Sequence, residues 1–208
     1  MMKPIERLAL MSGSSHRRIL NTATEELKEP MCLLVGQYYH DIVRVFSTYS
    51  YQSAERRDTE VWYGNQAAVE RIRKQEKVWQ EYESYVGGFH SHILGRENNS
   101  INPSEANNLS DNDIDFILGE MRALKKKKWL EIVLKIQELK RLPRAHSIGE
   151  TTRTRHRKIN SAVYDEPKHG YLSTFSAYLI YLADGKPKIK PLTLRDEIIE
   201  IVRRGYKE

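Results

Sequence analysis

Apolar positions along the chain change repeatedly between helical and extended spacing, which predicts a mixture of helices and strands. In residues 16–28 apolar side chains recur at the spacing of one helix face, and Pro30 follows them. Residues 31–35 are continuously apolar and are followed by Gly36, a pattern typical of a short buried strand. The first third of the chain therefore predicts a helix that leads directly into a core strand.

The rest of the chain continues this mixture, with two stretches that show no clear period. Further helices are predicted at residues 65–82, 110–127 and 193–204, and further strands at 38–51, 85–91, 129–136, 172–182 and 188–190. We interpret residues 93–109, rich in Asn, Ser, Gly and Pro, as a loop insertion, and residues 137–171 as a basic insertion or flexible loop. The order of elements predicts an α/β or α+β fold in a single domain over residues 1–208.

Composition narrows the class of protein. The chain has 208 residues, 39% of them hydrophobic and 30% charged, as expected for a folded and very soluble protein. Its single cysteine, Cys32, excludes an intramolecular disulfide and a cysteine-rich zinc site, so a metal site would use histidine and carboxylate. We interpret Cys32 as a packed side chain.

The N-terminal residues predict neither a signal peptide nor a membrane span. We expect a cytoplasmic protein without a membrane partner, and the sequence leaves its oligomeric state open.

Charge is unevenly distributed along the chain. The formal net charge is +6, yet residues 122–158 contain thirteen Lys and Arg against three Glu, a local +10. This segment could bind an acidic protein or nucleic acid, and a solvated basic surface explains it equally well. The aromatic interleaving typical of platforms for single-stranded nucleic acid does not occur at residues 153–158.

Two histidines form the strongest candidate for chemistry. His90 and His92 fall at the end of the strand predicted at 85–91, and alternation along a strand places both imidazoles on one face. A catalytic zinc site needs a third protein ligand and an open position. If Ser110 caps the following helix, Asp113 lies one turn into it and can turn back toward the histidines. The sequence therefore predicts a His, His, Asp metal site.

A hydrolase built on such a site also needs a base and a group that stabilises the developing oxyanion. Glu29, immediately before the apolar strand, is the leading base, and the Ser110 hydroxyl could donate to the oxyanion. Glu25 and Glu26 are competing bases, although both are expected inside the preceding helix.

These residues together resemble the JAMM motif of the JAB/MPN metalloprotease family. The match consists of a glutamate before an apolar strand that ends in glycine (residues 29–36), then His-Ser-His (90–92), then Ser-x-x-Asp (110–113). The resemblance covers roughly residues 15–136. It implies an MPN or cytidine-deaminase-like fold, a single domain whose curved, mostly antiparallel sheet is flanked by helices and carries insertions.

The resemblance also implies a function. It assigns one zinc ion per chain to His90, His92 and Asp113, the general base to Glu29, and oxyanion stabilisation to Ser110. Members of the family use a zinc-activated water to hydrolyse an isopeptide or peptide bond, often at the C-terminus of ubiquitin or a ubiquitin-like protein. We therefore expect a deubiquitinase-like metallopeptidase whose substrate is a ubiquitin-like or small carrier protein.

Three points remain open at the level of sequence. Ile93 replaces the proline that usually follows the second histidine, and the seventeen residues 93–109 exceed the family's spacing, which suggests an insertion beside the site. A rival alignment through residues 103–107 would place Asn107 where the acidic ligand belongs, and carboxylate is the better zinc ligand. The alternatives to an enzyme are a non-catalytic MPN-type interaction scaffold and a nucleic-acid-associated protein with a JAMM-like site.

Overall fold

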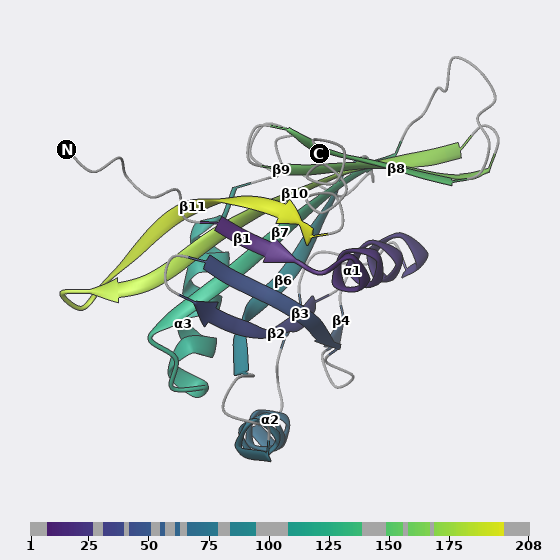
Figure 1. Cartoon of the computed structure of the whole chain (residues 1–208). Helices are drawn as coiled ribbons and strands as arrows, with labels where there is room; N and C mark the ends of the chain where they lie inside the picture. The colour runs from purple at the N-terminus through teal and green to yellow at the C-terminus, as the bar shows by residue number, and fades with distance from the viewer. Residues whose placement is uncertain are drawn as a thin grey trace, which may run out of the picture.

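The computed structural model describes residues 8–26, 31–39, 42–50, 55–56, 61–62, 66–78, 84–94, 108–138, 149–155, 158–166 and 169–197. Within these residues the elements follow in the order β1 (Leu8–Met11), α1 (Gly13–Glu26), β2 (Met31–Tyr39), β3 (Ile42–Ser50), β4 (Glu55–Arg56), β5 (Val61–Trp62), α2 (Gln66–Val78), β6 (Ser84–Leu94), α3 (Asp111–Ala123), β7 (Lys128–Glu138), β8 (Gly149–Arg155), β9 (Lys158–Glu166), β10 (His169–Ala183) and β11 (Lys186–Asp196). Strands dominate, and the helices lie at the periphery of the sheet (Figure 1).

Seven of the described strands close into a mixed barrel. Neighbours pair in the order β11, β1, β3, β2, β6, β7, β10, and β10 also pairs with β11, which joins the two ends. The pairs β1–β11, β1–β3 and β6–β7 are parallel, and the other pairs of the barrel are antiparallel. The expected fold class, an MPN or cytidine-deaminase-like domain with a curved, mostly antiparallel sheet flanked by helices, is therefore wrong, because the sheet is a closed mixed barrel with few helices.

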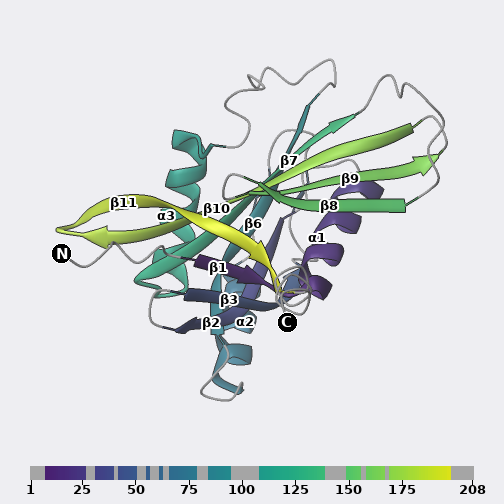
Figure 2. The ribbon, with the colours of Figure 1, turned by 45° about the horizontal axis from the view of Figure 1, so that its top comes forward.

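The length of β10 explains how the sheet closes. One edge of this 15-residue strand pairs with β7, while its other edge pairs first with β9, through residues 169–175, and then with β11, through residues 177–183. Two successive partners on one edge let the sheet branch. β9 and β8 continue outward from the barrel, and β11 curves back to β1 (Figures 1 and 2).

Side-chain alternation separates the inside of the barrel from its outside. On β7 the even-numbered residues 130–136 are fully buried in the main core, together with Phe89 of β6 and Phe175 of β10. Apolar side chains removed from water in this way supply most of the driving force for folding. Because side chains alternate, the odd-numbered residues of β7 belong to the opposite, outer face of the sheet.

Helix α3 covers part of this outer face. Ile117, Met121 and Leu124 pack with Trp129 of β7 and Ile180 of β10 in a second buried cluster. The helix thus begins beside β6 and β7 and is held there by its own apolar face. Within the described residues, no helix is long and apolar enough to cross a membrane.

Helix α1 is fixed to the end of β11 by a buried polar pair. The His16 Nδ1 and Asp196 Oδ2 atoms lie 2.9 Å apart, and the His16 ring contacts the Phe175 ring edge-on at 4.8 Å between centroids. The Ser12 hydroxyl accepts a hydrogen bond from the Ser15 backbone N–H, so the helix is capped from outside its first turn. The predicted helix at 16–28 is confirmed over its described part, with an earlier start.

The C-terminal third departs from its prediction in two places. Residues 149–155 and 158–166, expected within an insertion or flexible loop, form the paired strands β8 and β9. Residues 193–196, expected to begin a helix, belong to β11 and pair in parallel with residues 8–11 of β1. At residues 193–196 a long-range strand pairing overrides the weak local pattern, whereas β8 and β9 are consecutive strands that pair with each other. The remainder of the helix predicted at 193–204 falls largely outside the described residues.

Candidate metal centre

The two predicted histidines lie together on the outer face of β6. Phe89 and Ile93 point into the main core and Ser91 is fully buried, so alternation places His90 and His92 on the opposite face. Their ring centroids are 5.0 Å apart, and their side chains remain 14% and 11% exposed. The prediction of a strand that presents both imidazoles on one face is confirmed.

Asp113 reaches the histidines from the first turn of α3. Ser110 is the N-cap of this helix and forms a capping box with Asp113: the Ser110 side chain accepts from the Asp113 N–H at 3.2 Å, and the Asp113 carboxylate accepts from the Ser110 N–H at 2.7 Å. The Ser110 hydroxyl donates to the same Asp113 Oδ2 at 2.7 Å. These bonds hold the carboxylate at a helix N-terminus, where negative charge is favourable.

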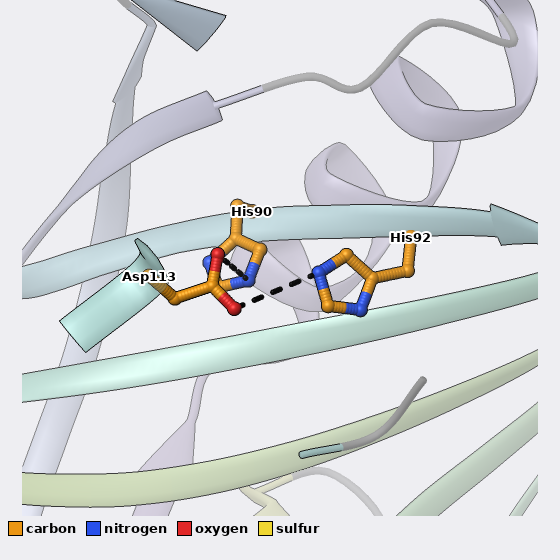
Figure 3. Close-up of side chains that lie close together, drawn as sticks. All are labelled: His90, His92 and Asp113. Atoms are coloured by element: carbon orange, nitrogen blue, oxygen red, sulfur yellow. Dashed lines mark ion pairs between the residues drawn. The ribbon is translucent and has the colours of Figure 1, made fainter. Parts of the chain in front are cut away.

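The three side chains converge (Figure 3). His90 Nε2 lies 3.6 Å from Asp113 Oδ1, and His92 Nε2 lies 4.0 Å from Asp113 Oδ2. One ligand atom from each residue falls within 4.8 Å of the others. Zinc with bonds of about 2.0–2.2 Å holds tetrahedral donors about 3.3 Å apart, so the two carboxylate contacts exceed that separation by less than about 1 Å. Two imidazoles and a carboxylate at these distances can hold a metal ion.

Glu131 of β7 contacts His90 on the side of the ring away from Asp113. This residue was not among the predicted site residues. Its Oε1 atom lies 2.7 Å from His90 Nδ1, and its Oε2 atom accepts a hydrogen bond from Trp129 Nε1–H at 2.7 Å. The side chain is only 2% exposed. The sequence does show a glutamate inside the otherwise apolar run at 129–134, which marks a buried acid that needs a partner. The partner itself depends on the parallel pairing of β6 with β7, in which Gly88 lies opposite Glu131.

Two glycines of β6 let it approach β7 at this point. A Cβ atom at Gly87 would lie 1.7 Å from the Leu130 carbonyl oxygen, a distance that no side chain can adopt. A Cβ atom at Gly88 would lie 3.0 Å from Glu131 Oε2 and 3.1 Å from Trp129 Cζ2. The Gly87-Gly88 pair therefore provides the room for β7 and for the two side chains behind His90.

A second acid, Glu120 of α3, is buried on the inner side of the helix. Burial, and to a smaller extent the negative charge of Glu131, raises the pKa of Glu120 to about 7. Two acids thus lie in the layer between α3 and the barrel, although only Glu131 bonds to a histidine of the site.

The remaining predicted site residues have different outcomes. Ser110 lies at the site as the cap of α3, with its hydroxyl bonded to Asp113, so the structure gives it a positioning contact. Glu29 and the rival ligand segment at 104–107 lie outside the described residues, as do residues 95–107 of the expected loop insertion. Cys32 is buried among the main core residues and is not part of the cluster of candidate ligands.

The basic segment at 122–158 is described by the structure over residues 122–138, 149–155 and 158. Its lysine run lies in the turn between α3 and β7, where Lys126 pairs with Glu76 of α2 and Lys125 adopts a positive φ of 55°. Lys135 and Lys158 lie on different strands of the sheet, half-buried; burial, and secondarily the charge of Lys135, lowers the pKa of Lys158.

Comparisons with known proteins leave the family open. A scan against family models and a search of curated proteins both gave no match. Among solved structures, the chain is similar to protein DSY2949 from Desulfitobacterium hafniense, determined in solution by a structural genomics consortium. The two are 15% identical, the match covers 91% of this chain and 94% of that chain, and the TM-score is 0.46.

Proposed function

We propose that this chain is a zinc-dependent metallopeptidase of JAMM type, which hydrolyses an isopeptide or peptide bond at the C-terminus of a ubiquitin-like or small carrier protein. The observation that supports it is the convergence of His90, His92 and Asp113 from β6 and α3 into one set of donor atoms within 4.8 Å. The proposal rests on this site and on the order of motif residues around it, and it does not rest on the fold.

The donor set suits catalysis better than a purely structural metal. Structural zinc sites are usually closed by four protein ligands and are rich in cysteine, whereas catalytic sites use three protein ligands and keep one position open. Within the described residues the cluster contains three ligands, and Cys32 is not among them. The side chains of His90, His92 and Asp113 are partly exposed, at 14%, 11% and 22%.

Each residue would have a separate task. His90, His92 and Asp113 would hold the ion, and a bound zinc ion would supply the Lewis acidity that makes water a competent nucleophile near neutral pH. Glu29 accepts and returns the proton as the proposed general base. Ser110 holds Asp113 through its hydroxyl and its N–H, and it would have to release the hydroxyl bond before it could donate to an oxyanion.

The proposal is tested by cleavage of a panel of ubiquitin-like and small carrier proteins carrying a C-terminal amide-linked reporter. Zinc-loaded wild type should release the reporter, His92→Ala should lose both zinc and turnover, and Glu29→Gln should keep zinc but lose turnover. Asp115→Asn is the matched control, since Asp115 is exposed on the same helix and is not part of the cluster. Full turnover by His92→Ala would refute the proposal; zinc binding without turnover on any conjugate would favour the interaction scaffold instead.

A further inference from the structure

Glu131 is the one described acid that is both buried and bonded to a proposed metal ligand. Each of its two oxygens faces a ring nitrogen at 2.7 Å: Oε1 faces His90 Nδ1, and Oε2 faces Trp129 Nε1. The indole nitrogen can only donate, and an ionised carboxylate can only accept. Glu131 is therefore oriented by Trp129 and, once oriented, offers His90 an acceptor.

This contact decides which nitrogen of His90 carries the proton. When Nδ1 donates to the Glu131 carboxylate, the neutral ring has its lone pair on Nε2. Nε2 is the atom that lies 3.6 Å from Asp113 Oδ1, in the cluster of candidate ligand atoms. The pairing therefore presents His90 in the tautomer that a metal ion requires, before any ion is bound.

The surrounding backbone accommodates this arrangement. Gly88 opposes Glu131 in the parallel β6–β7 ladder, and a Cβ atom there would crowd both Glu131 Oε2 at 3.0 Å and Trp129 Cζ2 at 3.1 Å. Trp129 itself is fully buried against α3, the helix that carries Asp113. The supporting residues of His90 and the helix that delivers Asp113 thus share one packed layer.

We infer that Glu131 is a positioning residue of the metal centre: held by Trp129, it fixes the tautomer and orientation of His90 and thereby raises the affinity of the site for a divalent metal ion. The inference rests on the proposed metal site, but it does not depend on peptidase activity. Outer carboxylate partners of histidine ligands typically change metal affinity by about 10–100-fold.

The test is the zinc dissociation constant, measured by competition with a chelator, for wild type, Glu131→Gln, Trp129→Phe and the double variant. Glutamine has one acceptor oxygen but would face two donors, so Glu131→Gln should weaken zinc binding by about 10–100-fold. Trp129→Phe removes one of the two donors and lets the glutamine oxygen turn to His90. The Glu131→Gln change should therefore weaken zinc binding less in the Trp129→Phe background than in wild type.

A control and an independent measurement separate positioning from general stability. Glu76 also accepts two contacts, from the Tyr85 backbone N–H and from Lys126, away from the cluster; Glu76→Gln should reduce stability while leaving zinc affinity within about threefold of wild type. Nitrogen-15 NMR of the zinc-free wild type should show His90 with its proton on Nδ1.

The possible results distinguish this inference from the proposed function. Zinc bound equally well by wild type and Glu131→Gln, or His90 protonated on Nε2 alone in the zinc-free wild type, would overturn the role of Glu131 and leave the metal site intact. Failure of wild type itself to bind zinc would remove the metal site on which both depend.

Discussion

At the scale of single residues, Glu120 and Glu131 show how two buried acids in one layer differ. Glu131 accepts from His90 and Trp129, whereas Glu120 Oε2 has no hydrogen-bond partner among the described residues. The cost of burying a carboxylate without compensation favours its protonated form, which is why the pKa of Glu120 rises to about 7. Glu120 should therefore oppose folding at high pH.

The pH dependence of stability tests this difference. The pKa of Glu120 is about 7 in the folded chain against an ordinary 4.5. The folded chain therefore holds this proton more tightly than the unfolded chain, and the stability that the protonated Glu120 gives is lost as pH rises from about 4.5 through 7. Glu120→Gln removes this loss, and its free energy of unfolding relative to wild type should rise by up to about 3 kcal/mol between pH 4.5 and pH 8. Urea unfolding at both pH values measures it; a difference that does not change with pH would contradict the buried, protonated state.

The residues of the site were predictable to different degrees for a physical reason. His90, His92 and Asp113 could be found because ligand chemistry, strand alternation and helix capping are all local properties of the sequence. Glu131 could not be assigned, since its partner is defined only by the parallel register of β6 and β7. A lone acid in an apolar strand marks a position that needs a partner, but it does not name that partner.

At the scale of elements, backbone features of β6 and α3 and the packing of α3 together place the ligands. Gly87 lets β6 lie against the Leu130 carbonyl, and the capping box at Ser110 sets the first turn of α3. The extended spacing between His92 and Asp113 does not prevent their meeting, since α3 is anchored by its own apolar face on the barrel. The position of Asp113 therefore follows from where α3 packs, as well as from the length of the loop before it.

Two glycine-to-alanine substitutions distinguish a glycine needed for close packing from one that only makes the backbone more flexible. Gly87→Ala would bring a methyl group onto the Leu130 carbonyl and should cost about 3 kcal/mol or more in the free energy of unfolding. Gly119→Ala lies in the middle of α3, and beyond the helix's own nearby backbone nothing lies within 4 Å of its Cβ position, so this variant should instead gain about 0.5–1 kcal/mol. Thermal or urea unfolding of both variants measures this contrast, and a stable Gly87→Ala would show that β6 and β7 are not in such close contact.

At the scale of the whole molecule, barrel closure was the feature that local patterns could not predict. The strand at 172–182 was predicted, and two of its partners, β9 and β11, are its neighbours in the chain, whereas its third partner β7 is separated from it by β8 and β9. Residues 193–196 have a helical pattern, but they pair with β1 and complete the barrel. This non-local pairing overrides local propensity, so most strands of the barrel were predicted, while β1, β8, β9 and the arrangement of the strands were not.

Closure also shapes the exposed edge of the sheet. Among the described residues, β1 covers only residues 193–196 of β11, so residues 186–192 have β10 on one side and present an edge on the other. This edge carries exposed Lys186, Lys188 and Lys190, interspersed with Pro187 and Pro191. Lysine and proline on an edge strand commonly prevent the edge-to-edge association of two sheets. This role explains the positive charge of residues 186–190 without a binding partner.

The metal centre is tested most directly by the zinc content and zinc affinity of three purified forms: wild type, Asp113→Asn and Asp115→Asn. Both substitutions remove one carboxylate from the same helix, and only Asp113 lies within the His90–His92 cluster. We predict about one zinc ion per chain for wild type and Asp115→Asn, and binding weakened by at least about 100-fold in Asp113→Asn. Absence of zinc binding by wild type, or equal binding by all three forms, would contradict the metal centre on which the proposed function depends.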